Sequence, residues 1–356
     1  MSIPSLHALP AERFETPAIL KRLNTASRNL AELKGVAASI PNQDILVSTL
    51  TLQEARDSSA IENIVTTQDD LYREEDAATA TGTAVKEVLR YRQALRTGYA
   101  QVRRHGLLTL NTILDIQRQL ECNRAGLRKL PGTALRDGTG RLVYEPPQEA
   151  GEVARLMGEL ERFIHDEPPF SADPLVKMAL IHHQFESIHP FYDGNGRTGR
   201  IINVLYLVKE GLLDIPVLYL SRHIVRTKPD YYRLLQAVRE QDAWEQWVLY
   251  MLDAVAGTAS ETVATIQSIK ILLQRTKQRV RDRYRFYSQD LINNLFNHPY
   301  TRVEFVQRDL GVSRITATKY LDALAADGVL EKVKVGRNNY YINRPLFALL
   351  SGSAPA

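Results

Sequence analysis

Cysteine is nearly absent from this chain of 356 residues, in which Cys122 is the only one. A single thiol excludes an intramolecular disulfide and a metal site built on several cysteines. Long apolar runs are also missing, so the sequence predicts neither a membrane-spanning helix nor a secretory signal in residues 1–17. From these absences we expect a cytoplasmic protein without a membrane partner.

A strong excess of one charge is missing as well. The 45 lysines and arginines nearly balance the 41 aspartates and glutamates, and the formal net charge is +4. This excess is too small to predict nucleic-acid binding by itself. The hydrophobic content of 44% and the charged content of 24% are typical of a soluble globular protein. The length allows two or three domains with a substantial core.

One stretch, residues 189–200, concentrates polar chemistry, with the sequence HPFYDGNGRTGR. Gly194 and Gly196 allow the backbone to turn sharply and to present its N–H groups outward. The apolar run at 201–208 indicates a helix, so the glycine turn is expected to open that helix. A helix N-terminus of this kind binds anions, because its first N–H groups are unpaired and its dipole is positive.

The side chains of this stretch suit a polyphosphate. Arg197 and Arg200 are three positions apart and would point to one side of the helix. Asp193 offers a hard oxygen ligand for a magnesium ion between phosphates. His189 is the one group of the stretch that can take up a proton near neutral pH. Together they indicate phosphoryl or nucleotidyl transfer.

The stretch resembles the signature of the Fic family, H-x-F-x-[D/E]-G-N-G-R-x-x-R, at every fixed position. The resemblance implies transfer of AMP from ATP to a Ser, Thr or Tyr hydroxyl of a protein, including the chain itself. It implies that His189 accepts the hydroxyl proton, that Asp193 holds Mg²⁺, and that the two arginines clamp the outer phosphates. The nucleotide-binding residues that it implies in the signature are Gly194, Asn195, Gly196, Arg197, Thr198, Gly199 and Arg200.

A second pattern of that family, [S/T]-x-x-x-E-[G/N], matches Ser58, Glu62 and Asn63. It lies in or just after a helix expected from Ile45 towards Ser58. Taken alone, the pattern favours a solvated helix turn, and the signature at 189–200 reverses this preference. In family members that carry it near the N-terminus, its glutamate opposes the second arginine of the signature. The resemblance therefore implies autoinhibition by Glu62 against Arg200.

Residues 126–149 change character and contain the turn sequence Asp-Gly-Thr-Gly at 137–140. The short runs at 133–136 and 141–144 flank this turn, which predicts a β-hairpin. An ordinary surface hairpin is the alternative to a functional one. In Fic proteins such a hairpin is the flap, here about 131–147. The resemblance implies that this flap holds a protein substrate beside the active site by strand addition.

The segment after the signature helix is expected to begin with a loop at 219–222 and to continue as a helix from Pro229. Tyr231 and Tyr232 on that helix resemble the tyrosines beside the family's adenine pocket, and two core aromatics are the alternative. Family members often carry an asparagine where this chain has Arg239, which leaves the adenine contacts open.

A metal site of the hydrolase type would need His182 and His183 together with His189 and Asp193. Adjacent histidines on a helix face different directions and do not easily bind one ion. We therefore expect His182 and Glu186 to face the core in structural roles.

The C-terminal third is basic at first and then has a helix-turn-helix pattern. Residues 271–285 carry a run of arginines and lysines, which we interpret as a connector. Helices at 303–310 and 313–326, followed by two strands, resemble a winged helix. DNA would contact the second helix and the wing, and protein docking or dimerisation is the alternative. The candidate DNA-binding residues are Arg314, Thr316, Thr318, Lys319, Lys334 and Arg337.

The predicted fold is thus mainly α: a helical Fic-type catalytic domain with a β-hairpin flap, and a C-terminal winged helix. The expected parts are an N-terminal helical region (1–110) with the inhibitory motif (58–63), a catalytic core (111–270), the connector and the winged helix (286–350). Two other functions stay open. One is removal of AMP at the same site, alone or beside its transfer. The other is a nucleotide-sensing transcription regulator. A homo-oligomer is a further open partner.

Overall fold

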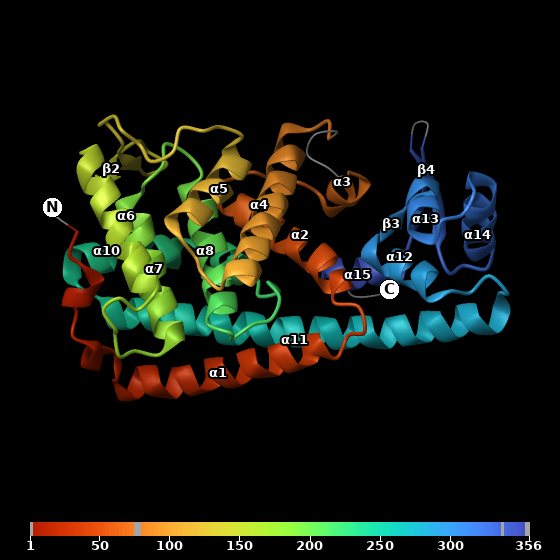
Figure 1. Ribbon diagram of the computed structural model, residues 1–356, viewed down its shortest axis with the longest axis horizontal. Coiled ribbons are helices and arrows are strands. Elements are labelled where there is room, and N and C mark those ends of the chain that lie inside the picture. The colour runs from red at the N-terminus through yellow and green to blue at the C-terminus, as the bar shows by residue number, and fades with distance from the viewer. Residues whose placement is uncertain (1–2, 75–79, 336–337, 353–356) are drawn as a thin grey trace.

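The computed structural model describes residues 3–74, 80–335 and 338–352, and these are mainly helical (Figure 1). The centre of the catalytic part is a pair of buried helices, α7 and α8. Asp173 caps α7 and Pro174 occupies its first turn, and every residue from Leu175 to Ile188 is buried. The helices of this bundle are α4 (Thr83–His105), α5 (Leu110–Glu121), α6 (Ala150–Ile164), α7 (Pro174–Ile188) and α8 (Asn195–Lys209).

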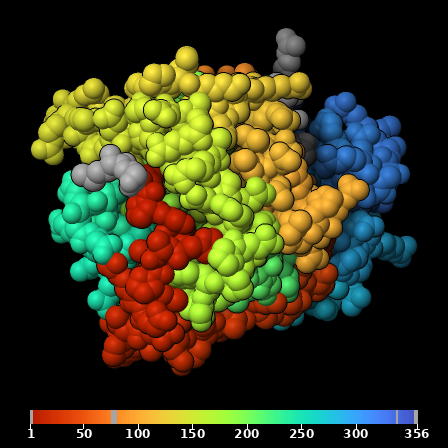
Figure 2. Space-filling view, turned by 60° about the vertical axis from the view of Figure 1, so that its left-hand side comes forward, coloured from red at the N-terminus to blue at the C-terminus, as the bar shows by residue number. Residues whose placement is uncertain are grey.

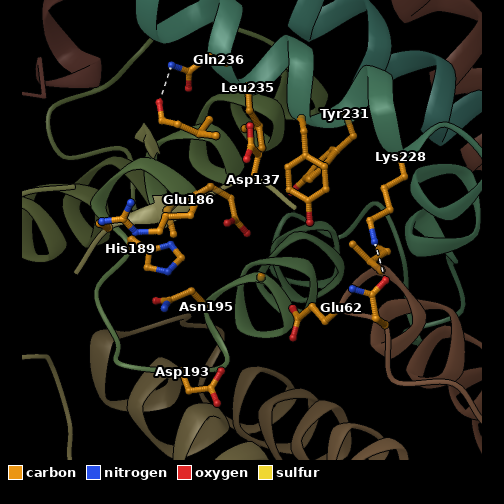
Figure 3. Close-up of a pocket in the computed structure, with 18 of the residues that line it drawn as sticks. Glu62, Asp137, Glu186, His189, Asp193, Asn195, Lys228, Tyr231, Leu235 and Gln236 are labelled. Carbon is orange, nitrogen blue, oxygen red and sulfur yellow. Dashed lines mark hydrogen bonds between the residues drawn. The ribbon is translucent and has the colours of Figure 1, made fainter. Parts of the chain in front are cut away.

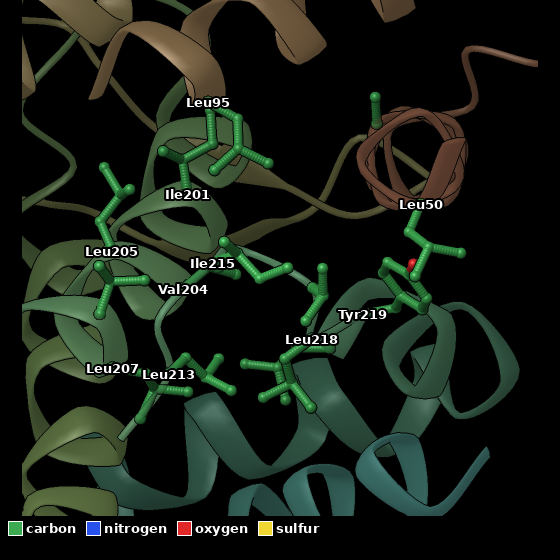
Figure 4. Packing of buried hydrophobic residues seen from close by; sticks show 14 of the residues in the cluster. Leu50, Leu95, Ile201, Val204, Leu205, Leu207, Leu213, Ile215, Leu218 and Tyr219 are labelled. Carbon is green, nitrogen blue, oxygen red and sulfur yellow. The ribbon is translucent and has the colours of Figure 1, made fainter. Parts of the chain in front are cut away.

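Apolar side chains of α8 pack against α4 and against the segment that follows α8 (Figure 4). Gly98 of α4 allows the close approach, because a Cβ atom at this position would lie 2.5 Å from Leu205 of α8. The buried cluster includes Leu95, Ile201, Val204, Leu205, Leu213 and Leu218. This packing fixes the first turn of α8, where the signature lies.

The longest helix, α11 (Trp244–Arg283), has 40 residues and runs beneath the bundle, with α1 (Pro17–Ala38) packed along it (Figure 1). Figure 2 shows the N-terminal segment in red against the yellow-green and blue-green helices. The expected connector at 271–285 is not a separate link, since α11 continues through it to Arg283. Leu273 and Val280 are buried there, because the helix also supports the C-terminal part.

Further helices before α11 are α2 (Asp44–Ile61), α3 (Gln68–Arg73), α9 (Leu220–Arg226) and α10 (Lys228–Gln241). The expectation of a loop at 219–222 is wrong: Leu220 begins α9, whose apolar residues pack against α2 and α11. On α2, the buried Glu54 accepts hydrogen bonds from the Tyr91 hydroxyl (3.1 Å) and the Ser221 backbone N–H (3.2 Å). These bonds join α2 to α4 and α9.

The predicted hairpin is present as β1 (Leu135–Arg136) and β2 (Leu142–Tyr144), which pair antiparallel. The C-terminal part consists of helices and a three-stranded antiparallel sheet of order β3-β5-β4, an arrangement typical of a winged helix. Of the residues proposed for DNA contact, Arg337 lies outside the described residues. The elements of this part are α12 (Gln289–Asn297), β3 (Tyr300–Thr301), α13 (Val303–Leu310), α14 (Arg314–Ala326), β4 (Glu331–Val335), β5 (Asn338–Ile342) and α15 (Arg344–Ser351).

The C-terminal part packs on α2 and α3 as well as on α11. Tyr72 of α3 stacks on Tyr300, with ring centroids 6.0 Å apart, and meets Phe347 edge-on. Gln53 of α2 and Gln68 of α3 both donate side-chain hydrogen bonds to the Leu350 carbonyl. The C-terminal part therefore contacts α2, the helix that carries the predicted inhibitory motif, at a residue that precedes the motif. Within the part of the chain that the structure describes, no helix is both long and apolar enough to span a bilayer.

Candidate functional site

A cavity of about 690 Å³ lies where the end of α2, the hairpin, the signature loop and α10 meet (Figure 3). Residues far apart in the sequence share its wall. Those used below are Glu62, Asn63, Glu186, His189, Asp193, Gly194, Asn195, Gly196, Arg200, Lys228, Tyr231, Tyr232, Leu235, Gln236 and Arg239. The structure thus brings most of the predicted site residues around one space.

The signature loop is shaped by Gly194 and Asn195. Gly194 caps α8 with a φ of 76°, which glycine adopts without strain. The Asn195 side chain accepts a hydrogen bond from the Phe191 N–H (2.8 Å) and donates one to the Phe191 carbonyl (2.9 Å). Because both ends of this amide are used to close the loop, the anion-binding groups left here are the backbone N–H groups at the start of α8.

His189 follows α7 in the left-handed conformation, with a φ of 48°, and its N–H bonds to the Phe185 carbonyl (2.9 Å). Its ring points into the cavity (Figure 3). Burial lowers the pKa of His189 to about 4, and the nearby positive charges of Arg128 and Arg239 add to this effect. At neutral pH the imidazole is therefore uncharged and able to accept a proton.

Arg128 is a residue that the sequence analysis missed. It is buried, and its guanidinium donates hydrogen bonds to the carbonyls of His189 (2.8 Å), Ile188 (3.3 Å) and Pro147. Its backbone N–H also bonds to the Pro190 carbonyl (2.9 Å). Arg128 thereby joins the signature loop to the base of the hairpin. It lies outside both motifs, so only the fold reveals it.

Arg200 is almost fully buried and contacts two residues of the predicted inhibitory motif, Ser58 and Glu62. Its Nη2 atom lies 2.7 Å from Oε1 of Glu62, and its Nε donates to the Ser58 hydroxyl at 2.7 Å. The Ser58 carbonyl accepts a further bond from Nη2 (3.0 Å). Asn63 follows the C-cap of α2 with a φ of 64° and accepts a hydrogen bond from Lys228 (3.1 Å). The expected contact between Glu62 and Arg200 is present.

Arg197 has a different environment. Its guanidinium contacts three carboxylates, those of Glu62 (2.9 Å), Glu87 (3.2 Å) and Glu121 (2.8 Å). Arg197, Thr198 and Gly199 are not among the residues that line the cavity. The expectation that Arg197 clamps phosphates beside Arg200 therefore disagrees with this arrangement, because the carboxylates hold it away from the cavity.

The two tyrosines of α10 also differ from each other. Tyr231 is buried against Trp247, and its hydroxyl lies 2.9 Å from His182 Nε2, whereas Tyr232 is 49% exposed. Both line the cavity. Arg239 of the same helix packs over the Tyr144 ring of the hairpin, with 3.9 Å between guanidinium carbon and ring centroid. The hairpin is therefore fastened to α10.

The sequence predicted that His182 and Glu186 of α7 both face the core, and the structure confirms this only for His182. His182 is buried in the core, as expected, and burial lowers its pKa to about 3. The core-facing interpretation of Glu186 is wrong, because its side chain, only 8% exposed, lines the cavity. Helical spacing predicted burial correctly but could not distinguish a core face from a cavity face.

A divalent cation fits this cavity only if a bound ligand supplies some of the oxygen atoms that coordinate it. Among the described residues, no group of three or more His, Cys, Asp or Glu side chains could hold a metal ion. Asp193 lines the cavity, and its Oδ1 accepts a hydrogen bond from the Gly194 N–H (2.7 Å). Its exposed carboxylate suits Mg²⁺, which commonly binds through one or two carboxylates together with substrate phosphates.

Three family models match the chain in succession. They are described as Fic/DOC family N-terminal (residues 20–100), Fic/DOC family (107–207) and protein adenylyltransferase SoFic-like, C-terminal domain (272–346). The Fic/DOC match contains the whole signature, and the N-terminal match contains Ser58, Glu62 and Asn63.

Curated relatives include two proteins named protein adenylyltransferase Fic. The one from Aedes aegypti is 28% identical over 157 residues, which is 44% of this chain and 30% of the relative. The one from Drosophila sechellia is 32% identical over 151 residues, which is 42% of this chain and 29% of the relative. The chain thus matches less than a third of these relatives' length.

Solved structures share the fold. A Fic family protein from Desulfovibrio desulfuricans matches with a TM-score of 0.58 and 22% identity, covering 92% of this chain and 96% of that one. A Fic domain containing signaling protein from Bacteroides thetaiotaomicron matches with a TM-score of 0.54 and 15% identity, covering 68% of this chain and 95% of that one. From the signature loop, the fold and the three consecutive family models together, this chain is a member of the Fic/DOC family.

Proposed function

We propose that this protein transfers AMP from ATP to a hydroxyl group of a protein side chain. The observation that carries the proposal is the uncharged His189 ring in the same cavity as the first turn of α8 and Arg200. A proton acceptor beside an anion-binding helix start suits attack of a hydroxyl on a phosphate. The relatives named protein adenylyltransferase Fic support the same reaction.

In this reaction His189 accepts the proton as the hydroxyl oxygen attacks the α-phosphorus, and pyrophosphate leaves. The backbone N–H groups of the first turn of α8 stabilise the charge that develops on the phosphate oxygens. Arg200 holds the terminal phosphate once its present carboxylate partner has moved away. Asp193 would hold Mg²⁺, which neutralises phosphate charge when it is bound.

We also propose that Glu62 inhibits the transfer. Its carboxylate occupies the guanidinium that the terminal phosphate would need, at 2.7 Å. A Cβ atom on Gly196 would lie 2.7 Å from Glu62 Oε1, so the carboxylate also covers the start of α8. ATP bound beside this carboxylate would have its phosphates displaced from the position for attack. The hairpin, with the exposed Leu142 and Val143, is the proposed dock for the target segment.

A second candidate reaction is removal of AMP from modified proteins. It is favoured by the position of Glu62 in the cavity wall, where its carboxylate could orient a water molecule. A nucleotide-sensing regulator acting through the C-terminal part has less support, since a sensor has no use for an uncharged His189 in the cavity.

The first test is substitution of His189. We expect His189→Ala to abolish incorporation of label from α-labelled ATP into protein, while ATP affinity changes little, because the phosphate contacts come from α8. Scintillation counting of protein and calorimetric titration with ATP measure the two quantities. His165→Ala, on α6's C-terminal cap, is the matched control and should transfer normally. Transfer by His189→Ala at the wild-type rate would exclude His189 as the base.

A further inference from the structure

We propose that Glu186 recognises the ribose of the bound nucleotide by accepting a hydrogen bond from one of its hydroxyl groups. The inference rests on the proposed function to the extent that the ligand is a nucleotide. It adds a specificity-determining residue that lies outside both sequence motifs. The carboxyl is at the middle of the cavity in Figure 3.

The first observation is that this buried carboxyl lacks a partner. Glu186 is 8% exposed, and no hydrogen bond or ion pair among the described residues involves its side chain. A buried carboxyl without donors is costly, and such groups in native structures usually have a partner. Because Oε1 is packed against Gly199, a ligand hydroxyl in the cavity would bind the other carboxyl oxygen, Oε2.

The second observation is that the neighbouring groups Arg200, His182 Nε2 and Arg239 Nε bind partners other than Glu186. Arg200 is bound to Ser58 and Glu62, and the His182 Nε2 atom is bound to the Tyr231 hydroxyl. Arg239 donates from Nε to the Ser187 hydroxyl at 3.0 Å. The protein therefore leaves the Glu186 carboxyl open towards the cavity, although polar groups surround it.

The third observation is the position of Glu186 along the cavity. On one side lies the start of α8, where the phosphates are proposed to bind, and on the other lie Tyr231, Leu235 and Gln236 of α10 (Figure 3). In a nucleotide, the sugar separates the phosphates from the base. A nucleotide with its phosphates on α8 and its base against α10 would have its ribose beside Glu186. Carboxylates are common acceptors for ribose hydroxyls.

The backbone of α8 fixes the carboxyl in this position. A Cβ atom on Gly199 would lie 2.8 Å from Glu186 Oε1 and 3.4 Å from the His182 ring, so only glycine leaves this space free. Oε1 is thus packed against α8, and the rest of the carboxyl lines the cavity. The glycine at 199, which does not line the cavity itself, acquires a role in shaping it.

The test compares nucleotides that differ in one hydroxyl. ATP, 2′-deoxy-ATP and 3′-deoxy-ATP are titrated calorimetrically into four proteins that all carry Glu62→Gly. These are the parent, Glu186→Ala, Glu186→Gln and the surface control Glu32→Ala. We expect the parent and the control to bind ATP up to about tenfold more tightly than one deoxy analogue, the magnitude of an ordinary hydrogen bond. Glu186→Ala should bind both alike.

Glu186→Gln keeps an acceptor oxygen and should retain part of the preference, which separates a lost hydrogen bond from a disturbed cavity. Equal affinities of the parent for all three nucleotides, or an unchanged preference in Glu186→Ala, would overturn the inference. So would a parent that binds no nucleotide. AMP transfer is measured separately with labelled ATP. A parent that shows the ribose preference but no transfer would refute the proposed function and leave the ribose contact in place.

Discussion

At the scale of single residues, two arginines three positions apart on α8 have different surroundings. Arg200 lines the cavity and is held by the end of α2, whereas Arg197 is held by three carboxylates from α2, α4 and α5. Glu62 contacts both of them. Its removal would free Arg200 for a ligand, while Glu87 and Glu121 would still hold Arg197.

We therefore predict that Glu62→Gly increases AMP transfer, by up to about a hundredfold if the inhibitory contact displaces the phosphates by about 1 Å. The measurement is the initial rate of label incorporation from α-labelled ATP. Adding Arg200→Ala should cancel the gain, and adding Glu240→Ala, an exposed position on α10, should not. If Glu62→Gly is no faster than the parent, the contact with Arg200 has no inhibitory role.

At the scale of elements, the hairpin and the signature loop form one assembly. Arg128 binds the carbonyls of Ile188 and His189 and that of Pro147 at the hairpin's base, and the Tyr192 hydroxyl accepts the Lys129 N–H (2.9 Å). Loops held at several points in this way keep a side chain such as His189 in one orientation.

We predict that Arg128→Met lowers kcat by roughly a hundredfold, because about 1 Å of movement at His189 has this effect. It should also move the acid limb of kcat/KM to higher pH. The Arg128 charge disfavours the protonated imidazole, so its removal raises the pKa of His189 from about 4 towards the ordinary value of 6.5.

The measurement is a pH profile of kcat/KM, in which the acid limb reports the free enzyme. Arg141→Met, at the exposed tip of the hairpin, is the matched control and should leave the limb unchanged. An acid limb that stays in place while kcat falls would show that Arg128 acts on the loop without an electrostatic effect on His189.

The sequence predicted those elements whose signals are local. The helix predicted at 313–326 is present and is capped by Ser313, and the turn at 137–140 joins two strands. It could not predict the role of Arg128, because the hydrogen-bond partners of its side chain are 19 or more positions away. It could not predict that Glu186 faces the cavity either, because none of the residues that the structure describes is its partner there. Likewise, α9 was missed since packing against α2 and α11, rather than a local pattern, favours it.

At the scale of the whole molecule, the C-terminal part and the cavity share α2. Its cavity end carries Glu62, and Gln53, more than two turns earlier, binds Leu350 of α15. Tyr300 and Phe347 pack on Tyr72 of the adjoining α3. This packing joins the C-terminal part, which the sequence indicates is a separate winged helix, to the helix that carries Glu62.

We predict that Tyr300→Ala loosens α2, lowers the free energy of unfolding by roughly 3 kcal/mol as large-to-small core changes do, and increases AMP transfer. In the Glu62→Gly background the same change should leave transfer unaltered, because no inhibitory contact remains to be released. Chemical denaturation and label incorporation measure the two effects. An equal gain in both backgrounds would mean that the C-terminal part does not act through Glu62.

Because α11 is one continuous helix, it fixes the distance between the residues that it presents to the catalytic part and those that it presents to the C-terminal part. Near the cavity, Trp244 packs edge-on against His183 (4.8 Å between centroids), and 35 positions later Arg279 binds the Asp327 carbonyl beside α14. At 1.5 Å per residue this stretch is about 50 Å long, and a one-residue insertion would turn one end by about 100° relative to the other. The helix is thus a spacer of fixed length and phase. Under the proposed function, a target protein that also bound α14 would have to extend from this end of α11 to the cavity to bring its hydroxyl to His189.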